Sequence, residues 1–140
     1  MNKINFMRVV VGGVIAGLII NTGEFLLNEV FFVNQMEAML RRLNTPRPGV
    51  NFIVTATLLT FVLGVVIVLM YAMIRPRFGS GPKTAIIAAL VVWFCVYVYA
   101  GMLNSVLFGV PSSVLALGIV WGAAEYTLGG LAGAWFYKEK

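Results

Sequence analysis

The chain has 140 residues, of which 61% are hydrophobic and 11% charged, and its formal net charge is +5. A soluble domain of this size cannot bury so much apolar surface in one core, so lipid must cover much of it. The composition therefore excludes a water-soluble protein and predicts a membrane protein. Anionic lipid headgroups next to basic loops account for the positive charge, and we expect no nucleic-acid partner.

Charged residues divide the sequence into apolar segments long enough to cross a membrane. Residues 48–74 carry no charge and exceed the roughly 20 helical residues that the hydrocarbon layer requires. Residues 84–124 are also uncharged and are interrupted by Gly109 and Pro111, so they must fold back as a hairpin. Such continuous apolar runs favour helices over the shorter, alternating strands of a barrel.

We predict one all-α domain over residues 1–140, a compact antiparallel bundle of four transmembrane helices. The expected spans are about 9–33, 50–74, 84–108 and 113–137. Lys3 and Arg8 precede an apolar run, as in a signal peptide, but no small-residue cleavage site follows. We therefore expect the first span to be retained.

Lysine and arginine residues predict the orientation. With a cytoplasmic N-terminus, more basic residues lie inside than outside, as the positive-inside rule requires. Those inside are Lys3, Arg8, Arg75, Arg77, Lys83, Lys138 and Lys140, and those outside are Arg41, Arg42 and Arg47. We expect a bacterial inner-membrane protein with both termini in the cytoplasm.

The two longer connections contain recognisable local patterns. Four apolar residues recur at helical spacing in the first connection: Met36, Met39, Leu40 and Leu43. This segment is either a short helix in the outer interface or an extension of the first span into water, with Glu37 and Arg41 as an i,i+4 pair. In the cytoplasmic turn we expect Pro76 to end the second helix and Pro82 to begin the third.

Glu24 and Glu125 are acidic residues inside otherwise apolar spans. An unpaired carboxylate there costs several kcal/mol, and no Lys or Arg lies within any expected span. Each carboxyl group must therefore be protonated, share a proton, bind a cation or contact water. Desolvation and a like-charged neighbour both disfavour the charged form, so the protonated form is the default expectation.

Candidate partners for these carboxyl groups share a helix face with them or lie on the third span. Asn21 and Asn28 lie at helical spacing from Glu24, and Trp93, Tyr97 and Asn104 form one face of the third span. These residues are candidates for binding a proton or cation, although such aromatic stripes are more often packing surfaces.

Glycines are also spaced for close helix packing, which turns the acidic faces toward protein instead of lipid. They are Gly13 and Gly17 in the first span and Gly118, Gly122, Gly129 and Gly133 in the fourth.

Composition argues against catalysis. The chain has no histidine and no aspartate, which removes the commonest general base and ordinary zinc or haem ligation. We expect no enzyme activity, no metal and no cofactor. Cys95 is the single cysteine, so no intramolecular disulfide forms.

Two functions fit these features. The first is a structural or accessory role through helix packing, with protonated Glu24 and Glu125, membrane lipid around the chain, and assembly into a homo-oligomer or a larger membrane complex. The second is a small proton- or cation-coupled transporter or channel that uses the same two residues.

The sequence resembles two groups of small membrane proteins. The layout of four short spans, with Glu24 in the first and Trp and Tyr residues nearby, is similar to that of the small multidrug resistance transporters. The sequence departs from that pattern in the late position of Glu24, the second acidic residue Glu125 and the long first external connection, so no substrate is carried over. Residues 71–85 resemble a turn in small uncharacterised bacterial four-helix inner-membrane proteins, which implies no activity.

Overall fold

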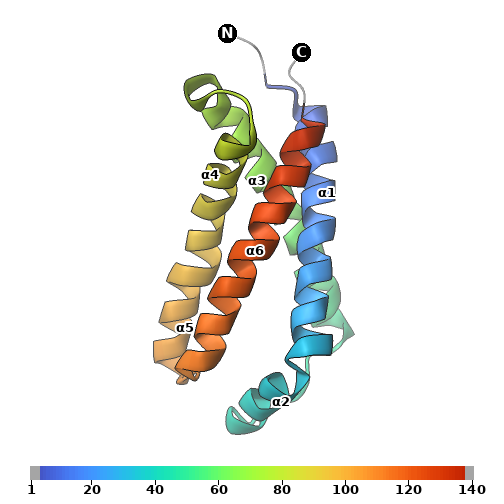
Figure 1. Cartoon of the computed structure of the whole chain (residues 1–140). Coiled ribbons are helices and arrows are strands. Elements are labelled where there is room, and N and C mark those ends of the chain that lie inside the picture. Colours follow the sequence, from blue (N-terminus) through green and yellow to red (C-terminus); the bar gives the residue numbers. More distant parts are fainter. Residues whose placement is uncertain (1–3, 138–140) are drawn as a thin grey trace.

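The computed structural model describes residues 4–137, and every regular element within that range is a helix (Figure 1). In chain order the elements are α1 (Phe6–Phe25), η1 (Leu26–Phe31), α2 (Val33–Arg42), α3 (Val50–Phe78), α4 (Pro82–Trp93), η2 (Phe94–Tyr99), α5 (Ala100–Phe108) and α6 (Ser112–Phe136). Here η1 and η2 are short π-helical segments that continue the helices before them. The expected all-α class is confirmed.

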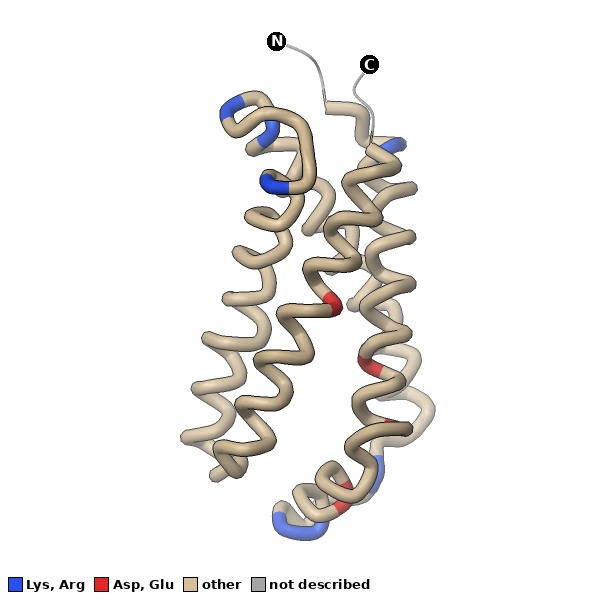
Figure 2. Tube along the Cα trace, viewed as in Figure 1, with Lys and Arg blue, Asp and Glu red and all other residues tan. Residues whose placement is uncertain are grey.

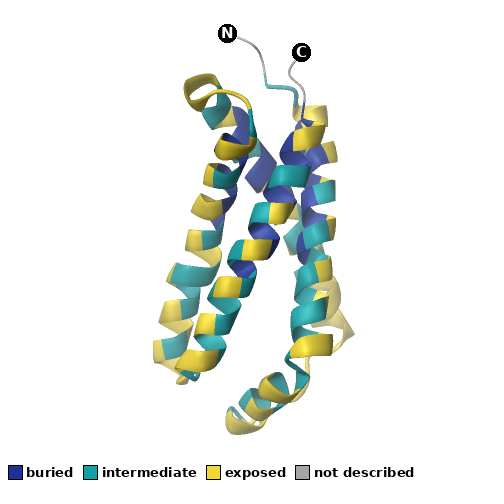
Figure 3. Cartoon of the chain, viewed as in Figure 1, coloured by how far each residue is buried: buried dark blue, intermediate teal, exposed yellow. Residues whose placement is uncertain are grey.

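Four continuous helices are long and apolar enough to cross a membrane: Phe6–Phe31, Val50–Phe78, Pro82–Phe108 and Ser112–Phe136. Their outer faces expose large apolar side chains such as Leu58, Val106 and Leu107, which a lipid bilayer would cover (Figure 3). The chain is therefore an integral membrane protein.

Helix α1 packs against α3 and α6, and α4 packs against the same two helices. Figure 1 shows that the spans form an antiparallel bundle with both ends of the chain at one end of it. Buried residues gather in that half of the bundle, whereas α1 and α6 diverge toward the other end (Figure 3). The largest fully buried side chains are Tyr126, Ile20, Ile67, Val9 and Val68.

Glycines allow the helices to approach closely in the buried half. A Cβ atom built on Gly64 of α3 would lie 2.9 Å from Gly17 Cα of α1, and one on Gly13 would lie 2.7 Å from the backbone nitrogen of Val65. A Cβ on Gly133 of α6 would lie 2.7 Å from the carbonyl oxygen of Gly12. Backbone therefore packs directly against backbone at both contacts of α1.

The turn between α3 and α4 depends on two glycines. Gly79 and Gly81 have φ angles of 83° and 141°, and the Thr84 hydroxyl donates to the Gly79 carbonyl at 2.7 Å. Pro82 begins α4, as expected. Pro76 does not end α3, which continues to Phe78, because a proline in the last turn removes only one backbone hydrogen bond.

The first connection contains a separate short helix, so the first span does not simply continue into water; the position of this helix in the outer interface stays a prediction. Phe32, with φ −124° and ψ 28°, interrupts the helix between η1 and α2. Glu37 on α2 forms ion pairs with Arg41, at 3.6 Å, and with Arg47. At the end of α2, a Cβ on Gly109 would lie 3.4 Å from Arg42 Nη2, so this helix reaches the turn between α5 and α6.

Lysine and arginine residues lie near the two ends of the bundle, and acidic positions occur between them (Figure 2). The end that holds the α3–α4 turn carries Arg8, Arg75, Arg77 and Lys83, and the opposite end carries the basic residues around α2. The remaining residues used to predict the orientation, Lys3, Lys138 and Lys140, lie outside the described residues. The cytoplasmic location of the termini stays a prediction.

The Gly13–Gly64 contact can be tested by adding one methyl group. We expect Gly64→Ala to lower the free energy of unfolding by about 1–3 kcal/mol, because the new Cβ would meet the backbone of α1. Gly118→Ala, which also lies inside a helix, is the matched control, since a Cβ there would make only an ordinary contact, 3.7 Å from the Tyr97 ring. Thermal and SDS-induced unfolding followed by circular dichroism would measure both. Without a clash, alanine should stabilise the helix, because it is a better helix former than glycine. A stabilised Gly64→Ala variant would therefore contradict this packing.

Candidate functional site

Tyr97 in η2 links two acidic residues from opposite ends of the sequence. Its hydroxyl oxygen is hydrogen-bonded to Glu24 Oε1 on α1 and lies 2.9 Å from Glu125 Oε1 on α6. The structure thus joins, through one phenol, the two carboxyl groups that the sequence singled out. We refer to these three residues as the Glu24–Tyr97–Glu125 cluster.

The geometry of this cluster limits how its protons can be distributed over the three side chains. A phenol carries one hydrogen, so Tyr97 can donate to one carboxyl group and must accept a hydrogen bond from the other. If both glutamates were ionised, one carboxylate oxygen would face the phenol oxygen with no hydrogen between them. The cluster therefore requires at least one carboxyl proton.

The surroundings of the two carboxyl groups favour Glu125 as the holder of that proton. Glu24 accepts hydrogen bonds from Tyr97 at Oε1 and from Asn28 Nδ2 at Oε2, the latter at 3.1 Å, and two donors favour a carboxylate. Glu125 is only 4% exposed, and its Oε2 atom is buried with no hydrogen-bond partner. Burial without donors favours the neutral acid.

Gly23 allows Glu125 to lie against α1. A Cβ atom on Gly23 would collide with Glu125 Oε2 and would lie 3.1 Å from Glu125 Cβ. Trp121, one turn before Glu125 on α6, donates from Nε1 to the Gly23 carbonyl oxygen at 3.1 Å. Its ring packs against Phe31 and Phe32, with centroids 5.6 and 6.3 Å away. These contacts fix α6 against α1 beside the cluster.

Both helices that supply donors to Glu24 are π-helical at that point. Asn28 lies in η1 and Tyr97 in η2. A π segment shifts the backbone hydrogen bonds from i+4 to i+5, and the Asn28 side chain donates to the Glu24 carbonyl oxygen at 2.8 Å. One amide group therefore satisfies both the backbone and the side chain of Glu24.

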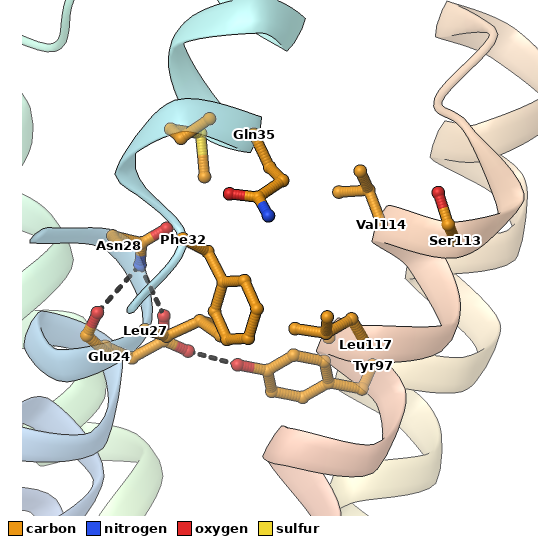
Figure 4. A pocket seen from close by; sticks show the side chains of 11 residues that line it. Glu24, Leu27, Asn28, Phe32, Gln35, Tyr97, Ser113, Val114 and Leu117 are labelled. Atoms are coloured by element: carbon orange, nitrogen blue, oxygen red, sulfur yellow. Dashed lines mark hydrogen bonds between the residues drawn. The ribbon is translucent and has the colours of Figure 1, made fainter. Parts of the chain in front are cut away.

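A cavity of about 370 Å³ opens beside Glu24, between α6 and the segment from α1 to α2 (Figure 4). Glu24 is the single charged residue among those that line it. The others are Leu27, Asn28, Phe32, Gln35, Met36, Tyr97, Ser113, Val114, Leu117 and Gly118. Glu125 does not line the cavity. Glu24 and Tyr97 lie between Glu125 and that space.

Several residues expected at the site lie elsewhere. The Asn21 side chain donates to the Thr57 carbonyl oxygen of α3 at 3.3 Å, and Trp93 Nε1 donates to the Ile119 carbonyl oxygen of α6 at 2.9 Å. Asn104 is exposed on α5, because the intervening π segment changes the helical phase on which its expected position relied. Asn28 and Tyr97 do contact Glu24.

The expected packing glycines divide between two neighbours. Gly13 and Gly17 face α3, while Gly129 and Gly133 face α1. Gly118 and Gly122 face the Tyr97 ring instead: a Cβ on Gly122 would lie 2.6 Å from it. The last two glycines therefore provide the space that the phenol occupies.

Gly23, Trp121 and most of the cavity wall were not among the residues expected from the sequence. Gly23 precedes Glu24 directly, and Trp121 lies one helical turn before Glu125, so proximity to an acidic residue was the available signal. The rest of the cavity wall carried no such signal, since its residues are apolar apart from Gln35 and Ser113 and come from separate segments.

The chain matches no protein-family model, no curated protein and no solved structure.

The proton assigned to Glu125 can be tested by replacing that residue with its amide. We expect Glu125→Gln to stay within about 1 kcal/mol of the wild-type free energy of unfolding, because the amide N–H can donate to the Tyr97 oxygen. Glu29→Gln, an exposed change in η1, is the control. Unfolding in mild detergent would measure both. A loss above about 3 kcal/mol would mean that Glu125 is buried as a charge.

Proposed function

We propose that this membrane protein is a small proton-coupled carrier that exchanges a proton for a monovalent organic cation at Glu24. The observation that carries the proposal is the position of Glu24: it is the one charged side chain lining the cavity, and it is hydrogen-bonded to Tyr97 and Asn28. Ionisable residues at membrane depth that face a cavity typically bind ions or relay protons.

The cavity wall favours an organic cation over a metal ion. Phe32, Tyr97 and Leu117 offer aromatic and apolar surface next to one carboxylate, which suits a cationic group attached to a hydrophobic body. Calcium would require six to eight oxygen ligands. Within residues 4–137 no group of three or more His, Cys, Asp or Glu side chains lies together.

Proton and cation compete because both need the same carboxylate. A cation binds Glu24 when the carboxyl group is ionised, and protonation removes that charge. Each ligand therefore expels the other, which is the thermodynamic requirement for coupled exchange. The proposed exchange involves no catalytic step.

An accessory role is the competing proposal. Glycine-rich faces give it less support than expected, since Gly12, Gly13, Gly64 and Gly133 are used in contacts within the chain. The broad apolar surfaces of α3 and α5 are open to lipid or to another subunit. Recovery of a larger partner in stoichiometric amount after purification in mild detergent would favour the accessory role.

Transport can be tested with benzyltrimethylammonium, a cation that cannot lose a proton. Proteoliposomes loaded with this cation and diluted into cation-free buffer should acidify their lumen, because each cation that leaves is replaced by an incoming proton. An entrapped pH-sensitive dye would follow the change. Glu24→Gln should abolish this flux, because the amide cannot be ionised, and Glu29→Gln, whose side chain is exposed outside the cavity, should keep it. Equal flux in all three proteins, or none in the wild type, would refute the proposal.

A further inference from the structure

We propose that Glu125 is a second, occluded proton site that exchanges its proton with Glu24, and hence with the cavity, through the Tyr97 hydroxyl. The geometry of the cluster supports the exchange itself, while its use in transport rests on the proposed function. The structure suggests this role because Glu125 is almost fully buried and yet has one carboxyl oxygen without a partner.

Protein surrounds Glu125 on the sides away from Tyr97. Gly23 covers Oε2 from α1, and the buried side chains Ile20, Ile67, Ala89, Val92 and Tyr126 form an apolar cluster toward the chain ends. The titratable groups that face it are Glu24 from α1, Tyr97 from η2 and Tyr126 from its own helix, while α3 and α4 contribute apolar side chains to this cluster. Tyr97 connects Glu125 to the cavity by hydrogen bonds, and the carboxyl groups of Glu125 and Glu24 are also direct neighbours, so the test below must separate the two routes.

Proton transfer along this connection is balanced and needs no other reactant. The Glu125 Oε1–H bond breaks as its proton bonds to the Tyr97 oxygen, and the Tyr97 O–H bond breaks as its proton bonds to Glu24 Oε1. Tyr97 is neutral before and after the step. One proton has moved from Glu125 to Glu24, and the negative charge has moved in the opposite direction.

The proton on Glu125 sets the charge of each state of the carrier, because an ionised Glu125 would add one negative charge to all of them. With Glu125 protonated, the cluster is neutral when Glu24 holds either a proton or a monovalent cation, and it carries one negative charge when Glu24 is empty. Closing the cavity around a negative charge is costly in a membrane, whereas closing it around a neutral cluster is not. Protonated Glu125 therefore restricts closure to the two loaded states, as coupled exchange requires.

The relay can be tested by hydrogen–deuterium exchange of the full-length protein, followed by time-resolved infrared spectroscopy of the protonated carboxyl bands at low pH. Glu24→Gln and Glu125→Gln assign the two bands. In Tyr97→Phe we expect the Glu24 band to exchange as in the wild type and the Glu125 band to exchange at least about tenfold more slowly. Tyr99→Phe, an exposed change in the same π segment, should leave both rates unchanged.

A second variant keeps the test valid if Tyr97→Phe fails to fold. Tyr97→Leu also removes the hydroxyl while keeping apolar volume against Gly118 and Gly122, so the Glu125 band should again exchange slowly. Exchange of Glu125 at the wild-type rate in either folded variant would overturn the relay. Slow exchange of Glu125 in the variants, with no cation-driven flux in the wild type, would support the relay and refute the carrier. Wild-type exchange of Glu125 in the variants, with cation-driven flux in the wild type, would refute the relay and support the carrier.

Discussion

The single hydrogen of the Tyr97 hydroxyl is the constraint on which the rest of the site depends. Two carboxyl groups meet that hydroxyl, and no Lys or Arg is hydrogen-bonded to either of them within residues 4–137. Charge must therefore be balanced by a proton or by a ligand. The surrounding residues act on this balance: Asn28 stabilises a charge on Glu24, and burial against Gly23 disfavours one on Glu125.

The two halves of the bundle differ in packing. Near the chain ends, glycine contacts such as Gly12 against Gly133 bring backbones together and leave no space for a ligand. Toward α2 the helices diverge, and the cavity occupies that space. The cluster lies where the two halves meet, so Glu24 is open to a ligand while Glu125 is enclosed. Dense packing in one half stabilises a fold whose other half is hollow.

Charge spacing and apolar length were enough to predict four spans, and the rule that buried carboxylates need partners identified Glu24, Glu125, Asn28 and Tyr97. Helical periodicity was less successful, since it assumes 3.6 residues per turn. The π segment that contains Tyr97 breaks this assumption, which is why Asn104 lies on the outside. The cavity itself was beyond prediction, because it depends on the angle between α1 and α6 and not on any local pattern.

The proposed carrier would also have to open toward the other side of the membrane, and the packing there bears on how it could do so. Apolar side chains around Tyr126, together with the Gly12–Gly133 and Gly13–Gly64 contacts, separate the cluster from the end that holds both termini. Contacts between glycine backbones contain few interlocking side chains, so helices joined in this way can slide or tilt without rotamer changes. The glycines that close one half of the bundle are thus also suited to opening it. If the termini are cytoplasmic, as the basic residues predict, the observed cavity faces outward, and in the proposed carrier the glycine contacts would lie on the inner side.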